Sequence, residues 1–173
     1  MPLAQLEKVE TNLRQLSRSM PQMPVSESLI LRASIILGRD TNVLLDTLLK
    51  PAELAEGEFR LLMSLLAHGG HACAGDVCAA LAQSPANLTR VADALVERGL
   101  LSRDPDVADR RRMLLTLLPK GKRLLDEMLP DVCKQVAALF AGFSAAEKKQ
   151  MLEFSKRLLA SIEALSNDIG TES

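Results

Sequence analysis

The chain has 173 residues, of which 47% are hydrophobic, and its formal net charge is −1. This length suits one domain of ordinary size with a sizeable core, and the near-neutral charge excludes a protein that binds nucleic acid over its whole surface. Phe is the only aromatic residue type, which excludes the Tyr and Trp platforms on which single-strand binders stack bases.

The N-terminal part is predicted to form two helices, because its apolar residues are mostly good helix formers. Residues 3–19 carry a narrow seam typical of a coiled coil, with apolar residues at alternating three- and four-residue steps. Its members are Leu6, Val9, Leu13, Leu16 and Met20. After the break at Met20–Pro24, Ser26 is the predicted N-cap of a second helix, which runs to Leu49 and is stopped by Pro51.

The central part is predicted to contain three further helices and two short strands. A helix over 56–67 ends at Gly69-Gly70, and two shorter helices follow over 75–82 and 85–98, the second ended by Gly99. The strands are expected over 100–103 and 112–117, joined by a polar loop over 104–111.

The C-terminal part is predicted to be helical again. Pro119 begins a helix that runs to Leu139 and either tolerates Pro130 or kinks there. Ser144 is the predicted cap of a last helix that ends near Asn167. This helix carries a second narrow seam, formed by Met151, Leu158, Ile162, Leu165 and Ile169. The two seams favour a homodimer, although packing against the chain's own protomer is the alternative.

The segment 84–98 has the pattern of a DNA-recognition helix. Ser84 suits the N-cap and Pro85 the first helical position. The predicted buried stripe is Leu88, Val91, Ala92, Leu95 and Val96; the opposite side carries Ala86, Arg90, Asp93 and Glu97, with Asn87 and Thr89 on the flanks. Its N-terminal half is free of acids, as a helix that enters a major groove N-terminus first requires. An ordinary amphipathic surface helix is the alternative.

Charge is concentrated around this helix and the hairpin that follows it. Residues 84–123 carry nine Lys and Arg against five Asp and Glu, a net +4, whereas the rest of the chain has a net charge of −5. Arg110, Arg111 and Arg112 follow the polar turn 104–106, and Arg side chains are attracted to the minor groove. We expect Asp109 to pair with one of these arginines and fix its direction.

These motifs, taken in order, resemble those of the MarR (multiple antibiotic resistance regulator) family over about residues 28–165. The resemblance rests on Phe59-Arg60-Leu61-Leu62, on Asn87-Leu88-Thr89-Arg90-Val91, on the run from Leu95 to Arg103, and on Asp106-Val-Ala-Asp109-Arg110-Arg111. Two departures concern helix caps, each worth about 1 kcal/mol. Leu117-Leu118 replaces the family's Leu-Thr, and Ala55 stands where Thr is common.

The resemblance implies a mainly α fold with a small β-wing, a winged helix-turn-helix flanked by dimerisation helices. It divides the chain into dimerisation helices over 1–50 and 119–173 and a DNA-binding lobe over 51–118. It also implies a homodimeric repressor of duplex DNA that is released by a small, often aromatic acid. By position, Thr89 and Arg90 fall in the contacting helix and Arg111 at the wing tip. The predicted DNA contacts are Ser84, Pro85, Ala86, Asn87, Thr89, Arg90, Asp109, Arg110, Arg111 and Arg112.

An effector is expected between the dimerisation helices and the DNA-binding lobe. Arg32, Arg39 and His68 are polar residues near that junction that could meet an anionic ligand, although surface salt bridges are the alternative for both arginines. The symmetric dimer predicts an inverted-repeat site, with recognition helices about 34 Å apart.

The remaining motifs favour neither a metal site nor an enzyme. His68, His71 and Cys73 lie together on a flexible turn without the convergent ligands of a zinc site, so we expect a turn and no metal or cofactor. Cys78 is expected to be a buried thiol, while a redox role for Cys73 or Cys133 stays open. There is no Gly-rich phosphate loop or nucleophile elbow. A winged helix that binds another protein is the alternative function.

The cellular location follows from two further patterns. Charged residues interrupt the apolar N-terminus, so it does not read as a signal peptide, and no apolar run approaches the length of a membrane span. The odd number of cysteines then favours a reducing, cytoplasmic location.

Overall fold

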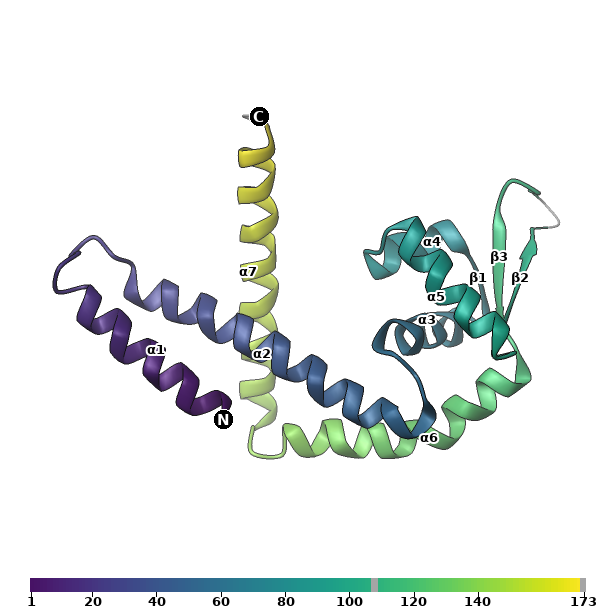
Figure 1. Cartoon of the computed structure of the whole chain (residues 1–173), viewed down its shortest axis with the longest axis horizontal. Coiled ribbons are helices and arrows are strands. Elements are labelled where there is room, and N and C mark those ends of the chain that lie inside the picture. The colour runs from purple at the N-terminus through teal and green to yellow at the C-terminus, as the bar shows by residue number, and fades with distance from the viewer. Residues whose placement is uncertain (107–108, 172–173) are drawn as a thin grey trace. The chain divides into compact units, whose positions relative to one another are not determined.

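The computed structural model describes residues 1–106 and 109–171 and shows a mostly helical chain with one small sheet (Figure 1). The elements are α1 (Pro2–Leu16), α2 (Val25–Leu49), the 3₁₀ turn η1 (Lys50–Ala52), α3 (Glu56–Ala67), β1 (His71–Cys73), α4 (Ala74–Leu81), α5 (Pro85–Glu97), β2 (Leu101–Pro105), β3 (Met113–Leu117), α6 (Pro119–Leu139) and α7 (Ala145–Thr171). The predicted fold class, mainly helical with a small β-wing, is confirmed.

The chain divides into two compact units, Met1–Met128 and Leu129–Ser173. The division falls inside α6, two residues before Pro130, and the helix continues through that proline. The first unit therefore contains every element up to the beginning of α6. The second contains the rest of α6 and α7.

The core of the first unit is built by α3 and α5 with the sheet beside them. Leu61, Leu62 and Leu65 of α3 are fully buried, and Leu88, Val91, Ala92 and Leu95 of α5 pack with them, each 3% exposed or less. This spacing lines one face of a helix, as predicted. Val96, expected in the same stripe, is 39% exposed, because it lies at the margin of the apolar arc.

The sheet has three antiparallel strands in the order β1-β3-β2, and one of them was not predicted. β1 lies in the stretch 68–73 that was expected to be a turn, and it pairs Ala72 with Leu115 of β3. A three-residue strand has too little pattern to be recognised without its partner. β2 extends through Pro105, which pairs with Met113, so the hairpin loop begins later than the predicted turn at 104–106.

The N-termini of α2, α7 and α3 differ in whether a side chain caps them. α2 begins at Val25, so Ser26 lies inside its first turn and does not cap it. α7 is capped as predicted: the Ser144 hydroxyl accepts the Glu147 amide (3.2 Å), and the Glu147 carboxylate accepts the Ser144 amide (2.7 Å). The hydrogen bonds from the Ser144 hydroxyl and amide lower the pKa of Glu147. The same reciprocal cap is only half formed at the start of α3. The Ala55 amide donates to the Glu58 carboxylate, but Ala55 has no hydroxyl to accept the Glu58 amide.

Gly121 is predicted to be intolerant of any side chain. A Cβ there would overlap the carbonyl oxygen of Leu100 and lie 2.8 Å from Cδ1 of Leu117. Gly121→Ala should therefore destabilise the protein by about 2 kcal/mol, as overpacking does in a filled core. Urea unfolding measures this, with Gly75→Ala as the control, because no atom lies within 4 Å of a Cβ at Gly75. Equal stability of the two variants would contradict the packing at Gly121.

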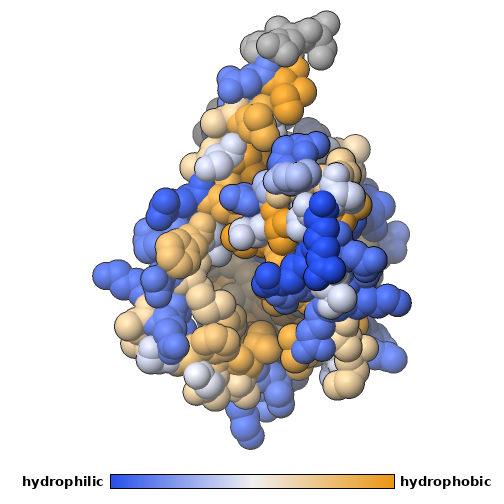
Figure 2. Space-filling model, turned by 90° about the vertical axis from the view of Figure 1, so that its left-hand side faces the viewer, coloured by the Kyte–Doolittle hydropathy of each residue, from blue (hydrophilic) through white to orange (hydrophobic). Residues whose placement is uncertain are grey.

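Two helices, α2 and α7, carry exposed apolar side chains. On α2, Ile30, Leu31, Ile35, Leu37 and Val43 are exposed, although α1 packs against α2 as an antiparallel partner (Figure 1). On α7, the predicted seam residues are all exposed, by 39 to 62%. In Figure 2, hydrophobic atoms run along the column that ends in the grey C-terminal residues. Leu152, Phe154 and Leu159 widen this face beyond the narrow seam that was expected.

Candidate nucleic-acid interface

The N-terminus of α5 is formed by a well-defined cap. The Ser84 hydroxyl accepts a hydrogen bond from the Asn87 amide at 3.3 Å, and Pro85 occupies the first helical position, as the sequence predicts. Ser84, Pro85 and Ala86 are exposed. The positive end of the helix dipole is therefore accessible to an anion.

Three polar side chains follow on the first turns of α5. Thr89 and Arg90 are exposed and Asn87 is half-buried. The Arg90 guanidinium donates to Oδ1 of Asn87 at 3.0 Å, so Asn87 orients the arginine one turn further along the helix. Thr89 and Arg90 are thus accessible on the first turns of α5, while Asn87 lies on a flank of the helix and positions Arg90.

The acidic half of α5 is tied to the sheet. Asp93 forms an ion pair with Arg103 of β2 at 3.1 Å. This contact neutralises one of the two acids on the outer side of the helix and links α5 to β2, the first strand of the hairpin. The sequence did not predict the pair, because the two residues meet only after the chain reverses at Gly99 between α5 and β2.

The hairpin tip is a β-turn that presents two arginines. The Arg112 amide donates to the Asp109 carbonyl at 2.8 Å, so Arg110 and Arg111 occupy the two central positions. The Asp109 carboxylate accepts the Arg111 amide at 3.0 Å, which makes Asp109 an organiser of the turn backbone rather than the guanidinium partner that was expected. Val107 and Ala108 of the predicted wing motif lie outside the described residues.

Arg112 is held differently from its neighbours. Its guanidinium pairs with Asp76 of α4 at 2.8 Å, so one of the three adjacent charges is neutralised within the chain. Among residues 1–106 and 109–171, neither Arg110 nor Arg111 has an ion-pair partner for its guanidinium. Asp76 was not predicted to take part, since it lies 36 residues before Arg112.

A cysteine of β1 lies beside the loop end of the hairpin. The Cys73 thiol donates to Oδ2 of Asp106 at 3.6 Å, and the Asp106 amide donates to the Arg112 carbonyl at 2.9 Å. Burial raises the pKa of the Cys73 thiol; Arg112 lowers it to a lesser extent, and the hydrogen bond to Asp106 raises it further. A protonated thiol is a weak nucleophile. Cys78, expected to be buried, is half-buried, because Val77 takes the core position on α4.

The three residues proposed from sequence for effector binding have separate surroundings. Arg39 bonds to Asp40 (2.8 Å) and to Gln5 of α1 (3.1 Å), and the His68 ring contacts the Ser64 carbonyl. Arg32 is exposed. A cleft of about 640 Å³ in the first unit is lined by other residues, among them Glu53, Arg98, Lys120 and Arg123. None of the three predicted residues lines it.

Two further features are absent from the described part of the chain. Within residues 1–106 and 109–171, no group of three or more His, Cys, Asp or Glu side chains is arranged to hold a metal ion. No described helix has the length and apolar character needed to cross a membrane.

Comparisons with known proteins agree on one family. The MarR family model matches residues 49–112. The chain is 31% identical over 122 residues to the transcriptional repressor MprA of Escherichia coli K12, an alignment that covers 70% of this chain and 69% of MprA.

Solved structures show the same fold. A MarR mutant from E. coli complexed with operator DNA superposes with a TM-score of 0.71 at 22% identity, over 80% of this chain and 99% of that one. BpsR of Bordetella bronchiseptica, whose DNA binding is regulated by 6-hydroxynicotinic acid, has a TM-score of 0.62 at 28% identity, over 69% of this chain and 85% of that one.

Proposed function

The chain belongs to the MarR family, and we propose that it is a homodimeric repressor that binds inverted-repeat duplex DNA and is released by a small molecule. The observation that carries this proposal is the pairing of two cationic features in one lobe. α5 begins with an exposed, acid-free turn, and a β-turn presents Arg110 and Arg111 at the end of the adjacent hairpin.

In this proposal α5 enters the major groove and the hairpin tip reaches the neighbouring minor groove. Ser84, Pro85 and Ala86 at the N-terminus of α5 lie against phosphates, which agrees with their exposure and with the positive end of the helix dipole there. Thr89 and Arg90 contact base edges, with Asn87 orienting Arg90. Arg110 and Arg111 contact the narrow groove. Arg112 and Asp109 position the tip, since each is engaged within the chain.

The dimer is proposed to form through residues 1–50 and 119–173, with the lobe 51–118 left free for DNA. The exposed apolar faces of α2 and α7 support this division, because patches of that kind on a single chain mark interaction surfaces. A twofold dimer matches an operator whose half-sites are related by inversion.

The effector is proposed to be a small aromatic or anionic molecule, which is the class named for BpsR. Such a ligand would act by favouring a distance between the two DNA-binding lobes of the dimer that does not match the distance between successive major grooves. The role is that of a regulator and not of an enzyme. Binding to duplex DNA, together with three free thiols, supports a cytoplasmic location.

Thr89→Val is expected to change which half-site sequences are preferred. The substitution keeps the side-chain shape and removes the hydroxyl, so discrimination at one base-pair position should fall about tenfold while the helix remains folded. Competition binding with a panel of single-base operator variants measures this. An equal loss on every member of the panel would contradict base contact by Thr89.

The proposed function is tested by selecting duplexes from a random pool with the full-length protein. The recovered sequences should converge on an inverted repeat, and affinity for that site should fall steeply between two salt concentrations as phosphate counterions are displaced. Recovery of sequences without a common motif would contradict specific DNA binding and favour a winged helix that binds a protein partner.

A further inference from the structure

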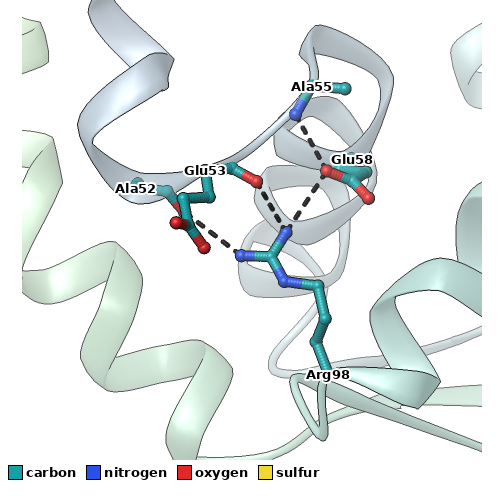
Figure 3. Close-up of polar contacts among 5 residues, drawn as sticks. All are labelled: Ala52, Glu53, Ala55, Glu58 and Arg98. Atoms are coloured by element: carbon teal, nitrogen blue, oxygen red, sulfur yellow. Dashed lines mark hydrogen bonds and ion pairs between the residues drawn. The ribbon is translucent and has the colours of Figure 1, made fainter.

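The C-terminal end of the recognition helix is joined to the element that follows α2 by one arginine, Arg98. Its guanidinium donates to the Glu53 carbonyl (2.8 Å) and the Ala52 carbonyl (3.1 Å), and it forms an ion pair with Glu58 (3.4 Å) (Figure 3). The Arg98 side chain is 31% exposed and that of Glu58 only 13%. A planar guanidinium that binds two successive carbonyls fixes both distance and angle between its partners.

The turn that Arg98 holds is conformationally unusual. Glu53 has φ +53°, in the left-handed region where glycine is favoured. Two hydrogen bonds, from the Glu53 amide to Lys50 and from the Leu54 amide to Leu49, end the α2–η1 helical run there. The carbonyl of this strained residue is the one nearest to Arg98. Glu53 thus sets the direction in which the chain leaves α2, and Arg98 at the end of α5 holds Glu53 in place.

The same helix end also contacts the beginning of α6. The Lys120 ammonium donates to the Arg98 carbonyl at 2.7 Å, and the backbone at Gly121 lies directly against Leu100. Gly99, with φ +66°, ends α5 with bonds from the Gly99 amide to Val96 and from the Leu100 amide to Leu95. The end of α5 therefore meets both segments that lead into the proposed dimerisation helices.

We propose that Arg98 is a positioning residue that sets the orientation of each recognition helix relative to the dimerisation helices, and thereby the half-site spacing that the dimer accepts. This inference rests on the proposed function. Arg98 lies at the opposite end of α5 from the N-terminal DNA-contacting turn, so it acts on DNA only through the placement of the helix. The two recognition helices of a dimer must fit successive grooves, so a small rotation at this junction changes the preferred spacing and leaves the base contacts unaltered.

The test repeats the selection from random duplexes with full-length Arg98→Met and Arg98→Lys. Both variants should recover the parental half-site sequence but with several half-site spacings instead of one. Affinity for the parental site should fall roughly tenfold, within the usual range for coupling between sites, while affinity for an isolated half-site should stay unchanged. Lysine should not restore a single spacing, because a point charge cannot bind two carbonyls in a fixed plane.

The matched control is Arg60→Met. Arg60 also donates to a backbone carbonyl, that of Leu81 at 3.0 Å, but this contact joins α3 to the end of α4 and does not reach the turn after α2. This variant should keep the parental spacing. A single parental spacing in both Arg98 variants would overturn the proposal, and so would loss of folding in both, since Arg98 would then be required for stability alone. If the parent protein itself selects no inverted repeat, the proposed function has failed instead.

Discussion

Replacing Ile162 by Glu should convert the dimer into monomers and reduce affinity for the inverted repeat by about 100-fold or more. Ile162 lies in the middle of the exposed apolar face of α7 and is 48% exposed in the single chain. A carboxylate buried at that position in a dimer would lose its hydration without gaining a partner. A monomer has only one recognition helix, so it loses the gain in affinity that comes from binding two half-sites at once.

The Ile162 prediction is checked by sedimentation and by titration of the selected duplex. Ala160→Glu is the matched control, because residue 160 lies nearly opposite residue 162 on the same helix. The control adds the same charge two positions away, and it should remain dimeric with parental affinity. A dimeric Ile162→Glu protein would contradict the assignment of α7 to the dimer interface.

Replacing Arg110 and Arg111 together by Ala should weaken DNA binding by about 100-fold, roughly tenfold for each charge-assisted hydrogen bond that the substitution removes. Both arginines sit at the centre of the hairpin turn, and their guanidinium groups have no ion-pair partner within the described ranges 1–106 and 109–171. Each phosphate interaction that is removed should also lower the slope of log affinity against log salt by about 0.9.

Arg112→Ala separates binding to DNA from placement of the hairpin. Because Arg112 is already paired with Asp76 at 2.8 Å, its removal should leave the salt slope close to the parental value while affinity declines moderately. Titrations of each variant at several salt concentrations measure both quantities. A slope reduction of about 0.9, the value expected for one lost phosphate interaction, would mean that Arg112 leaves Asp76 and binds a phosphate itself.

Most of the fold could be predicted from local pattern. The apolar spacing along α3 and α5 locates both helices and their buried faces, since a helix returns to the same side every three to four residues. Proline and glycine set several of the ends, including the start of α5 at Pro85 and its end before Gly99. The failures were at places where local pattern is short or ambiguous: the strand β1, the start of α2 near Ser26, and the side chains of Val96 and Cys78.

The candidate DNA-contacting residues could also be proposed from sequence, because they are recognised by residue type and by neighbours a few positions away. Ser84 caps a helix, Thr89 and Arg90 project from its first turns, and Asp109 begins a turn around two arginines. The contacts that hold these residues in place were not predictable. Asp76 meets Arg112 across 36 positions of the sequence and Arg98 meets Glu53 across 45, and no periodicity relates residues so far apart.

The sequence by itself thus determined the order of the α-helices and of the two hairpin strands, the polar face of α5 and the cationic hairpin tip, all of which depend on neighbours within a few residues. Only the tertiary structure decided which charges remain available to a partner and which are neutralised inside the chain. Of three adjacent arginines, Arg112 is bound to α4, whereas Arg110 and Arg111 occupy the turn. The physical reason is that ion pairs form between groups that are close in space, and closeness between distant segments is fixed only when the core brings them together.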